Sequence, residues 1–514
     1  MQNPVGFDLI DFLELGFAAL AVAALLSRPK NESALRWIAN RPWCSMGLLF
    51  ALPIVLRLCL LANHPVPVPS VSDDFSYLLL GDTLRHFRLA NPAHPMHRFF
   101  ETVFVLQEPT YSSIYPLGQG FVLMLGWAGV LLSVGLFCAL TYWMLRGWVS
   151  PAWALIGGLL AVMLFGPLNQ WTNNYWGGAV SAIAGCLVFG SIPRRNAVLL
   201  GLGLALQILT RPFEAVLLLL CVVPWLRWRV LLAVIPALGL TLLQNEAVTG
   251  SWTRLPYMLS REQYGIPAAF TFQKMPEPHR QLTQEQQLDY LAQKDVHDSS
   301  GSYWPRWAGR LKFLRFFLLP PMYIALLYFV PELRRKRYLW AAGCMLLFSL
   351  GTNIYPYFYP HYIAAVACLF LLMAVVGLAK APRLVLMLCG AHFIFWYSVH
   401  LFGNQALFEA TGPYESWDYI NFGDSEGRIA INARLHQAPG KELVFVRYSP
   451  RHLLREWVHN DADIDAAQTV WALDLGPEED AKLTAYYPQR TVWVVEPDSV
   501  PPRLTPAPSY RPAQ

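Results

Sequence analysis

Long apolar runs, separated by short charged or proline-rich joints, dominate the sequence. A run of about 20 apolar residues is what a helix needs to cross the hydrocarbon core of a bilayer. Only 14% of the residues are charged while 55% are hydrophobic, and soluble domains usually carry about a quarter charged residues. These features disfavour a soluble enzyme and predict a polytopic all-α membrane bundle.

The apolar runs give about twelve candidate spans, and the first is interpreted as a retained span rather than a cleaved signal peptide. Several are short, so their ends are approximate. The predicted spans are 8–27, 45–62, 117–145, 152–167, 178–192, 197–209, 213–226, 230–247, 313–331, 338–351, 361–378 and 384–402.

Basic residues follow every odd-numbered span and predict the orientation of the bundle. They are Arg28, Lys30, Arg36, Arg41, Arg146, Arg194, Arg195, Arg227, Arg229, Arg334, Arg335, Lys336, Arg337, Lys380 and Arg383. Joints rich in Lys and Arg stay on the cytoplasmic side. The chain is therefore predicted to be a multi-pass protein of the inner (plasma) membrane, with its even-numbered joints and C-terminal tail extracytoplasmic.

This orientation places several polar segments on one outer face. They are loop 63–116, joint 168–177, loop 248–312 and joint 352–360, together with the tail. Polar loops gathered on one face are where a membrane enzyme would build its site. The Gln-, Glu- and His-rich part of loop 248–312 is expected over the mouth of the cleft, where it could become ordered when substrate binds.

The tail differs from the membrane region, residues 1–402, in composition. Residues 403–514 hold 16 acidic against 10 basic residues, whereas residues 1–402 hold 18 against 29. Strand-like runs at 443–448, 469–474 and 491–496 alternate with helical patterns near 450–458 and 477–487, which predicts a small α/β domain over 403–499 with a parallel sheet. The Pro-rich end, 500–514, is predicted to be disordered.

Two adjacent acids, Asp73 and Asp74, begin an apolar-periodic stretch in the first outer loop. The stretch 75–89 is expected to be an amphipathic helix on the membrane surface. A structural interpretation is that Ser72, Asp73 or Asp74 caps this helix. The alternative is that one carboxylate is a general base for an acceptor hydroxyl.

This arrangement of an outer acidic pair after an early span, a many-span bundle and a soluble outer tail resembles the GT-C membrane glycosyltransferases. The resemblance covers residues 45–402 and is to the branch of protein O-mannosyltransferases and aminoarabinose transferases. It implies transfer of a sugar from a polyprenyl-phosphate donor to an acceptor on a lipid, glycan or protein, generally with inversion. The matching base is Asp73 or Asp74, with Asp73 favoured because it is nearer the span. The first span of this chain has no counterpart in the family pattern.

Arg211 lies at the predicted outer boundary between two spans. An ion pair with Glu214, three residues on, would explain such a residue structurally. A guanidinium also suits phosphate oxygens, and the resemblance implies that this position binds the donor phosphate. His361, at the start of the eleventh span, is a second candidate for the donor phosphate or the acceptor, although a backbone carbonyl could equally satisfy it.

The aromatic and amide residues of two outer joints are candidates for binding the sugar. Trp171, Tyr175 and Trp176 are typical of an interfacial belt, whereas Asn173 and Asn174 suit sugar hydroxyls. Possible substrate-binding residues are thus Asn173, Asn174, Tyr175 and Tyr359.

No metal site is predicted, because His94 and His97 have no further ligand pair nearby. A divalent cation shared by two carboxylates and a phosphate is left open. The Gly-rich nucleotide-binding motifs are absent, and the basic joints are too short for nucleic acid. The function predicted is a GT-C glycosyltransferase. The rivals are a ligase that moves a whole lipid-linked glycan and a non-enzymatic lipid or polysaccharide transporter.

Overall fold

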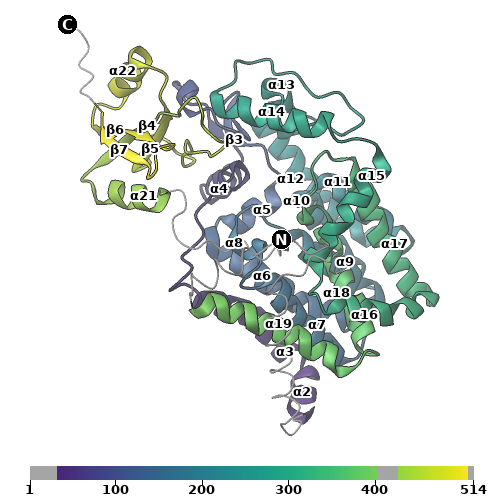
Figure 1. The fold of residues 1–514 in the computed structure, drawn as a ribbon. Helices are drawn as coiled ribbons and strands as arrows, with labels where there is room; N and C mark the ends of the chain where they lie inside the picture. The colour runs from purple at the N-terminus through teal and green to yellow at the C-terminus, as the bar shows by residue number, and fades with distance from the viewer. Residues whose placement is uncertain (1–31, 403–426, 508–514) are drawn as a thin grey trace.

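Helices form most of the protein in the computed structural model, which describes residues 32–402 and 427–507 (Figure 1). The helical region ends with α19 (Arg383–Phe402), and a small sheet domain follows. The longer helices before α19 are α2 (Glu32–Ala39), α3 (Pro42–Cys59), α4 (Ser72–Arg85), α5 (Leu117–Leu123), α6 (Gly126–Leu145), α7 (Pro151–Phe165), α9 (Ala179–Arg194), α10 (Ala197–Thr210), α11 (Pro212–Val222), α12 (Leu231–Thr249), α13 (Pro256–Tyr264), α14 (Gln284–Asp298), α15 (Tyr303–Arg310), α16 (Met322–Phe329), α17 (Lys336–Gly351) and α18 (Ala367–Leu378).

Short elements connect these helices. The one-turn helix α8 (Gln170–Asn173) lies in joint 168–177, and three short strands lie in loop 63–116. The strands are β1 (Asn91–Pro92), β2 (Val105–Leu106) and β3 (Thr110–Ser113), and the 3-10 helices are η1 (His97–Phe100), η2 (Val223–Trp225), η3 (Trp228–Val230), η4 (Leu311–Phe317), η5 (Val330–Arg334), η6 (Thr352–Ile354) and η7 (Pro360–Val366).

Predicted span 8–27 lies outside the described residues, and each of the other eleven coincides with one helix or with adjoining helical segments. By length and composition, five helices in the described part of the chain could cross a membrane, or six if a bent pair counts as one span. The expectation of a helical protein with membrane-spanning apolar helices is confirmed. The number of twelve spans stays a prediction.

Two predicted spans are not straight helices. Span 117–145 divides into α5 and α6 at Met124–Leu125, and Gly126 follows with a φ of +56°. Span 313–331 is bent by 109° between the segment ending at Phe317 and the one starting at Met322. The bend contains Pro320 and Pro321, which lack the amide hydrogen that a continuous helix needs.

Helix α9 lies at the centre of the packing that positions η7. Helix α9 packs against α6, α10 and η7. At the crossing with η7, a Cβ on Gly185 would lie 1.8 Å from the carbonyl oxygen of Ala365, so only glycine allows this approach. The close contact fixes η7, which carries His361 and Tyr362, beside α9.

The C-terminal domain contains a four-stranded sheet in the order β5-β4-β6-β7. Strand β4 pairs in parallel with both β5 and β6, so the predicted parallel sheet is present. The elements are α21 (Arg428–Gln437), β4 (Lys441–Val446), β5 (Thr469–Leu473), α22 (Pro477–Tyr486), β6 (Arg490–Glu496) and β7 (Arg503–Pro506).

Two predictions for this domain are wrong. Residues 450–458, which the sequence predicts to be helical, form a loop. Trp457 and Val458 of this loop are buried. The Pro-rich stretch after residue 500 is not disordered throughout, since β7 pairs antiparallel with β6. Proline is tolerated in β7 because this is an edge strand. Residues 508–514 and the predicted boundary at 403 lie outside the described residues.

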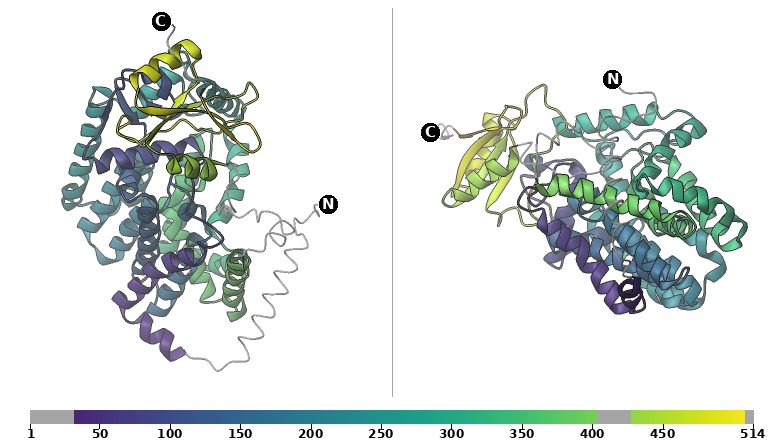
Figure 2. Two further views of the ribbon diagram at one scale, coloured as in Figure 1. Left: turned by 90° about the vertical axis from the view of Figure 1, so that its left-hand side faces the viewer. Right: turned by 60° about the horizontal axis from the view of Figure 1, so that its bottom comes forward.

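Helix α4 lies between the sheet domain and the helical bundle in Figure 1, and both views of Figure 2 place the sheet at one end of the molecule. Leu79 of α4 and Phe99 and Phe100 of the first outer loop share one apolar core with Leu443 and Phe445 of the sheet. The prediction that this helix rests on the membrane surface is therefore wrong, because other parts of the protein cover the apolar side of α4.

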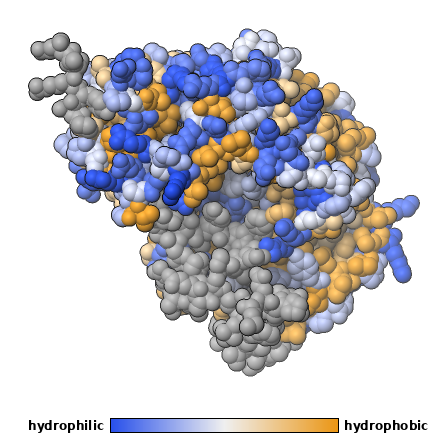
Figure 3. Space-filling model, turned by 45° about the horizontal axis from the view of Figure 1, so that its top comes forward, coloured by the Kyte–Doolittle hydropathy of each residue, from blue (hydrophilic) through white to orange (hydrophobic). Residues whose placement is uncertain are grey.

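The two sides of the molecule visible in Figure 3 differ in polarity. Figure 3 shows hydrophilic residues spread over the upper face and hydrophobic residues gathered along the right-hand side. Exposed apolar side chains on α11 and α12, among them Val216, Leu220, Leu232 and Ile235, fit a lipid-facing surface.

Candidate active site

Asp73 lies in the first turn of α4 and is partly exposed. The Tyr115 hydroxyl donates a hydrogen bond of 2.5 Å to its carboxylate, and the Tyr115 ring stacks on Tyr77, one turn further along α4, at 4.0 Å. Burial raises the pKa of Asp73, while the hydrogen bond from Tyr115 and the charge of Arg211 oppose that rise. A carboxylate within reach of an acceptor hydroxyl is a candidate general base.

Asp74 has a different environment, although it is adjacent in the chain. It is 2% exposed, and its carboxylate accepts hydrogen bonds from the backbone amides of Tyr175, at 2.8 Å, and Ser70, at 3.2 Å. Burial raises its pKa to about 7. Since both of its oxygens bind backbone donors, Asp74 fixes joint 168–177 against the start of α4.

The capping interpretation of the acidic pair is only partly correct. The N-cap residue of α4 is Val71, which makes no side-chain capping bond. Both acids lie in the first turn, where negative charge favours the helix dipole, and Asp74 reaches back to Ser70. The side chain of Asp73 instead accepts a hydrogen bond from the Tyr115 hydroxyl.

Arg211 separates α10 from α11 and is 16% exposed at its side chain. Its guanidinium lies 3.3 Å from Glu214, which is buried, and stacks over the Tyr362 ring at 4.9 Å. Pro212 begins α11 and breaks the helix at this position. The predicted ion pair with Glu214 is thus present and holds the guanidinium in place, and it leaves other donors of Arg211 for a further anion.

The structure brings Asp73, Arg211 and Tyr362 together from three distant parts of the chain. Arg211 is close enough to Asp73 to act on its pKa. Tyr362 interacts electrostatically with both of them and with Glu214. His361 precedes Tyr362, is 6% exposed, and lies 5.2 Å from the Trp176 ring and 5.5 Å from Tyr359, measured between centroids.

Joint 352–360 is fixed by two arginines. Arg310 of α15 donates to the carbonyls of Tyr355 and Pro356, at 2.7 and 2.9 Å, and Arg306 donates to that of Asn353 at 3.1 Å. Tyr355 in turn packs against Phe213, next to Arg211, at 5.5 Å between ring centroids. The end of loop 248–312 therefore supports the joint from which Tyr359 and His361 come.

The amide candidates of joint 168–177 are mostly used within the protein. Asn173 accepts from Arg57 and donates to the carbonyls of Pro167 and Asn169, so we do not retain it as a substrate-binding residue. The Tyr175 hydroxyl donates to the Pro67 carbonyl, which gives Tyr175 a structural contact too. Asn174 is buried and its side-chain oxygen has no hydrogen-bond partner. Tyr359 packs against Trp176 at 5.2 Å. Asn174 and Tyr359 stay predicted substrate-binding residues.

Arg57 was missed by the sequence analysis. It is 1% exposed inside predicted span 45–62, and its guanidinium donates to Asn173 and to the carbonyls of His64 and Pro65. A lone charge within an apolar span is the signal that could have identified it, because such a charge must find buried partners. Its role here is to join the start of the segment that leads to Asp73 to joint 168–177.

Asp289 of α14 is another residue that the sequence did not single out. It is 7% exposed, and burial raises its pKa to about 7, to which the charges of Asp73 and Glu285 contribute. The Gln- and Glu-rich part of loop 248–312 thus lies beside the candidate base, in line with its expected place over the site.

The two carboxylates of the first loop do not suit a shared divalent cation, because backbone amides occupy both oxygens of Asp74. In residues 32–402 and 427–507, no group of three or more His, Cys, Asp or Glu side chains could hold a metal ion. His94 contacts Asp465 and Tyr487 of the C-terminal domain, at 3.2 and 3.1 Å.

No protein-family model matches the chain, and no curated protein matches it. Among solved structures, ArnT from Cupriavidus metallidurans bound to undecaprenyl phosphate is similar, with 11% identity, a TM-score of 0.46, and coverage of 87% of this chain and 92% of that one. The apo form of the same protein gives 12% identity and a TM-score of 0.44 with the same coverage. The archaeal oligosaccharyltransferase AglB from Archaeoglobus fulgidus, in complex with an inhibitory peptide and a dolichol-phosphate, gives 12% identity and a TM-score of 0.37, over 87% of this chain and 69% of that one. These proteins are GT-C glycosyltransferases.

Proposed function

We propose that this protein transfers a sugar from a polyprenyl-phosphate donor to an acceptor hydroxyl at the outer surface of the membrane. The observation that carries the proposal is the pairing of a partly exposed carboxylate, Asp73, with a partly buried guanidinium, Arg211, within electrostatic range of each other. A base and an anion-binding group at such a separation suit a reaction in which a hydroxyl loses a proton while a phosphate departs.

The lipid part of the donor is inferred from the surroundings of Arg211. Helix α11 begins directly after Arg211, and its exposed side chains Val216, Leu219 and Leu220 are apolar. A molecule with a phosphate at Arg211 and a prenyl chain along this surface would bury its tail in lipid. A polyprenyl-phosphate carrier therefore matches both the charged group at Arg211 and the apolar surface of α11.

In the proposed reaction, Asp73 removes the proton from the acceptor hydroxyl as its oxygen attacks the anomeric carbon. The bond between that carbon and the phosphate oxygen breaks, and the phosphate leaves with the electron pair. Arg211 stabilises the negative charge that grows on it. Attack from the side opposite the phosphate would invert the anomeric configuration.

Surrounding residues would tune this chemistry. Glu214 and Tyr362 keep the guanidinium of Arg211 oriented, and Tyr115 orients the carboxylate of Asp73. His361 is proposed to contact the donor phosphate, with Tyr359 and Asn174 near the sugar. Asp74 is proposed to have a structural role, which leaves Asp73 as the candidate general base.

The test compares D73N with D74N in the purified full-length protein, assayed for transfer from a polyprenyl-phosphate sugar. Loss of a general base typically costs about 10²–10⁴-fold, so D73N should fall by at least about 100-fold while remaining folded. D74N should instead unfold at lower temperature. The NH₂ group of the new asparagine would face a backbone N–H that now donates to Asp74, and this unsatisfied contact should cost about 1–3 kcal/mol of stability.

Size-exclusion behaviour and thermal unfolding of both variants serve as the control for folding. Full activity in folded D73N would remove Asp73 as the base. Absence of any transfer by the wild-type protein, with a set of lipid-linked sugars and acceptors, would instead favour the transporter alternative.

A further inference from the structure

The fully buried residues of α14 are all polar, namely Glu285, Gln286, Asp289, Gln293 and His297. A helix held by the hydrophobic effect buries apolar side chains, yet Leu291 of this helix is 52% exposed. Tyr290 is only partly buried against an apolar cluster, so hydrogen bonds and charges make up the fully buried contacts of α14.

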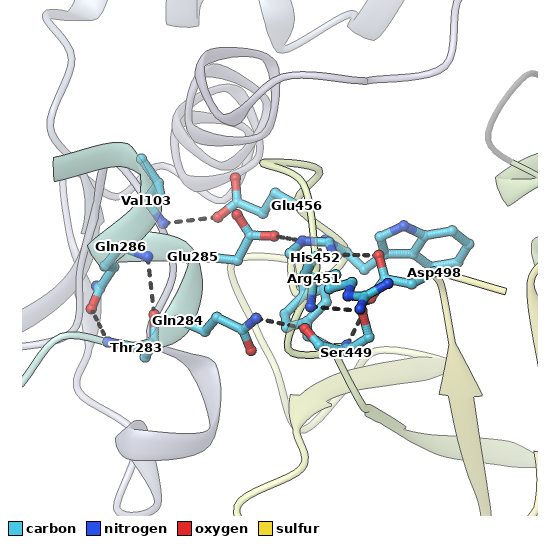
Figure 4. A network of polar contacts seen from close by, with 12 residues as sticks. Val103, Thr283, Gln284, Glu285, Gln286, Ser449, Arg451, His452, Glu456 and Asp498 are labelled. Carbon is cyan, nitrogen blue, oxygen red and sulfur yellow. Dashed lines mark hydrogen bonds and ion pairs between the residues drawn. The ribbon is translucent and has the colours of Figure 1, made fainter. Parts of the chain in front are cut away.

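The first turn of α14 meets the C-terminal domain through His452, as Figure 4 shows. The His452 imidazole contacts Glu285 of α14 through Nε2, and Asp498, which follows β6, at 2.6 Å through Nδ1. Both His452 and Glu285 are buried. Gln284 adds a 2.7 Å hydrogen bond to the carbonyl of Ser449. One imidazole thus joins two carboxylates from different parts of the chain.

His452 is surrounded mainly by acidic and aromatic groups. Besides Glu285 and Asp498, the Tyr448 ring lies 4.1 Å away between centroids, and Glu456 interacts electrostatically with Glu285. Arg428 binds the backbone carbonyl of Glu456. Burial opposes protonation of His452, but its two carboxylate partners outweigh burial and raise its pKa.

The same face of α14 leads from His452 to the candidate base. Asp289 lies one helical turn after Glu285 and interacts electrostatically with Asp73. Gln293, one turn further, donates to Asp289 at 2.6 Å and accepts from the amide of Ala268 at 2.6 Å. A shift of the first turn of α14 would therefore move the group that faces Asp73.

We propose that protonated His452 is a positioning residue that holds α14 beside Asp73 by joining Glu285 to Asp498. The inference rests on the proposed function only in treating Asp73 as the base, because the docking of α14 can be measured without any transfer assay. It gives the C-terminal domain a part in setting the geometry of the site.

The sign of the pH dependence follows from the elevated pKa of His452. The contact of His452 with both Glu285 and Asp498 needs the imidazolium, because both ring nitrogens must then donate. It is present below the pKa of His452 and is lost as pH rises through that pKa, which lies above the ordinary histidine value of about 6.5. Helix α14 should loosen at alkaline pH.

The experiment is hydrogen exchange of residues 284–298 in the full-length protein, in detergent or nanodiscs, at pH 6.5 and pH 9, after correction for the intrinsic pH effect. In wild type, exchange should be slow at pH 6.5 and faster at pH 9. H452Q should raise exchange at least tenfold at pH 6.5 and remove the pH response. H452K, which keeps a cation, should restore slow exchange at both pH values.

The matched control is H436Q, since His436 is an exposed histidine of the same domain. It should behave as wild type. If H452Q disturbs the sheet, seen as faster exchange in β4 and β6, E285Q tests the same bridge from α14. Exchange of 284–298 that is unchanged in H452Q and E285Q would overturn the proposal.

Activity measurements separate this proposal from the proposed function. An active D73N with a loosened α14 in H452Q would contradict only the assignment of Asp73. An inactive D73N with unchanged exchange in H452Q would contradict only the role of His452.

Discussion

Helices α4 and α14 both lie against the C-terminal domain and both bring a carboxylate to the candidate site, but different forces hold them. α4 shares an apolar core with the sheet through Leu79, together with Phe99 and Phe100 of the same loop. The fully buried residues of α14 are all polar, and the helix contacts the domain through His452 and Ser449. The contact of α4 with the domain is therefore mainly hydrophobic, whereas that of α14 is made by polar and titratable groups.

This difference separates a fixed part of the site from an adjustable part. Hydrophobic burial does not change with pH near neutrality, and close-packed cores resist displacement. Buried ion pairs are sensitive to protonation and lose strength when one partner is neutralised. Asp73 is thus placed on the rigid side, whereas Asp289 is placed on the side that pH can release.

The largest expected effect comes from a substitution in the apolar core that α4 and its loop share with the sheet. Phe99 is 2% exposed and lies 6.3 Å from Phe445 between ring centroids. F99A should destabilise the unit formed by α4 and the sheet by about 3–5 kcal/mol, because it removes a buried aromatic ring. Hydrogen exchange of β4 and β6 measures this loss, which should be equal at pH 6.5 and pH 9.

The matched control is F87A, because Phe87 lies in the same loop and is 94% exposed. Its effect should stay within about 0.5 kcal/mol. A pH-dependent loss in F99A would contradict the division between the two helices.

A smaller effect is expected at Arg211, which also lies among apolar helices. R211A should lower kcat by about 10²–10³-fold, as does removal of a group that stabilises charge in the transition state. R211K should retain part of the rate, since it keeps the charge beside Glu214 but loses the two-pronged donor. Kinetics with a polyprenyl-phosphate sugar give the comparison. R229A, an exposed arginine near the start of α12, should leave kcat unchanged, and equal rates for R211A and wild type would exclude a phosphate-binding role.

The smallest effect is expected for Y115F. The Tyr115 hydroxyl lowers the pKa of Asp73 against the effect of burial, so its removal should raise that pKa. The acidic limb of the profile of kcat/KM against pH should move to higher pH. At neutral pH the rate should fall by about tenfold, which corresponds to about 1.5 kcal/mol for a hydrogen bond to a charged group. An acidic limb that does not move would show that Asp73 does not control it.

Sequence reasoning identified the individual groups of the site better than their surroundings. Asp73 and Arg211 are candidates because each charge lies beside an apolar run and because the family resemblance implies a role for each, and the structure brings them within electrostatic range of each other. Asn173 and Tyr175 were chosen by side-chain type, and the structure gives them internal partners. The sequence pattern did not single out Arg57, which lies inside an apolar run, or Asp289, which lies among many other polar residues.

The apolar runs by themselves determined that this chain forms membrane-length helices, because their length and hydropathy leave few alternatives. The alternating strands likewise determined the parallel pairs of the small sheet. Only the tertiary structure decided which acid of the adjacent pair is enclosed by backbone amides and which faces the guanidinium. Partners distant in the sequence, such as Tyr115, Tyr175 and Arg211, set burial and protonation, and no local pattern encodes them.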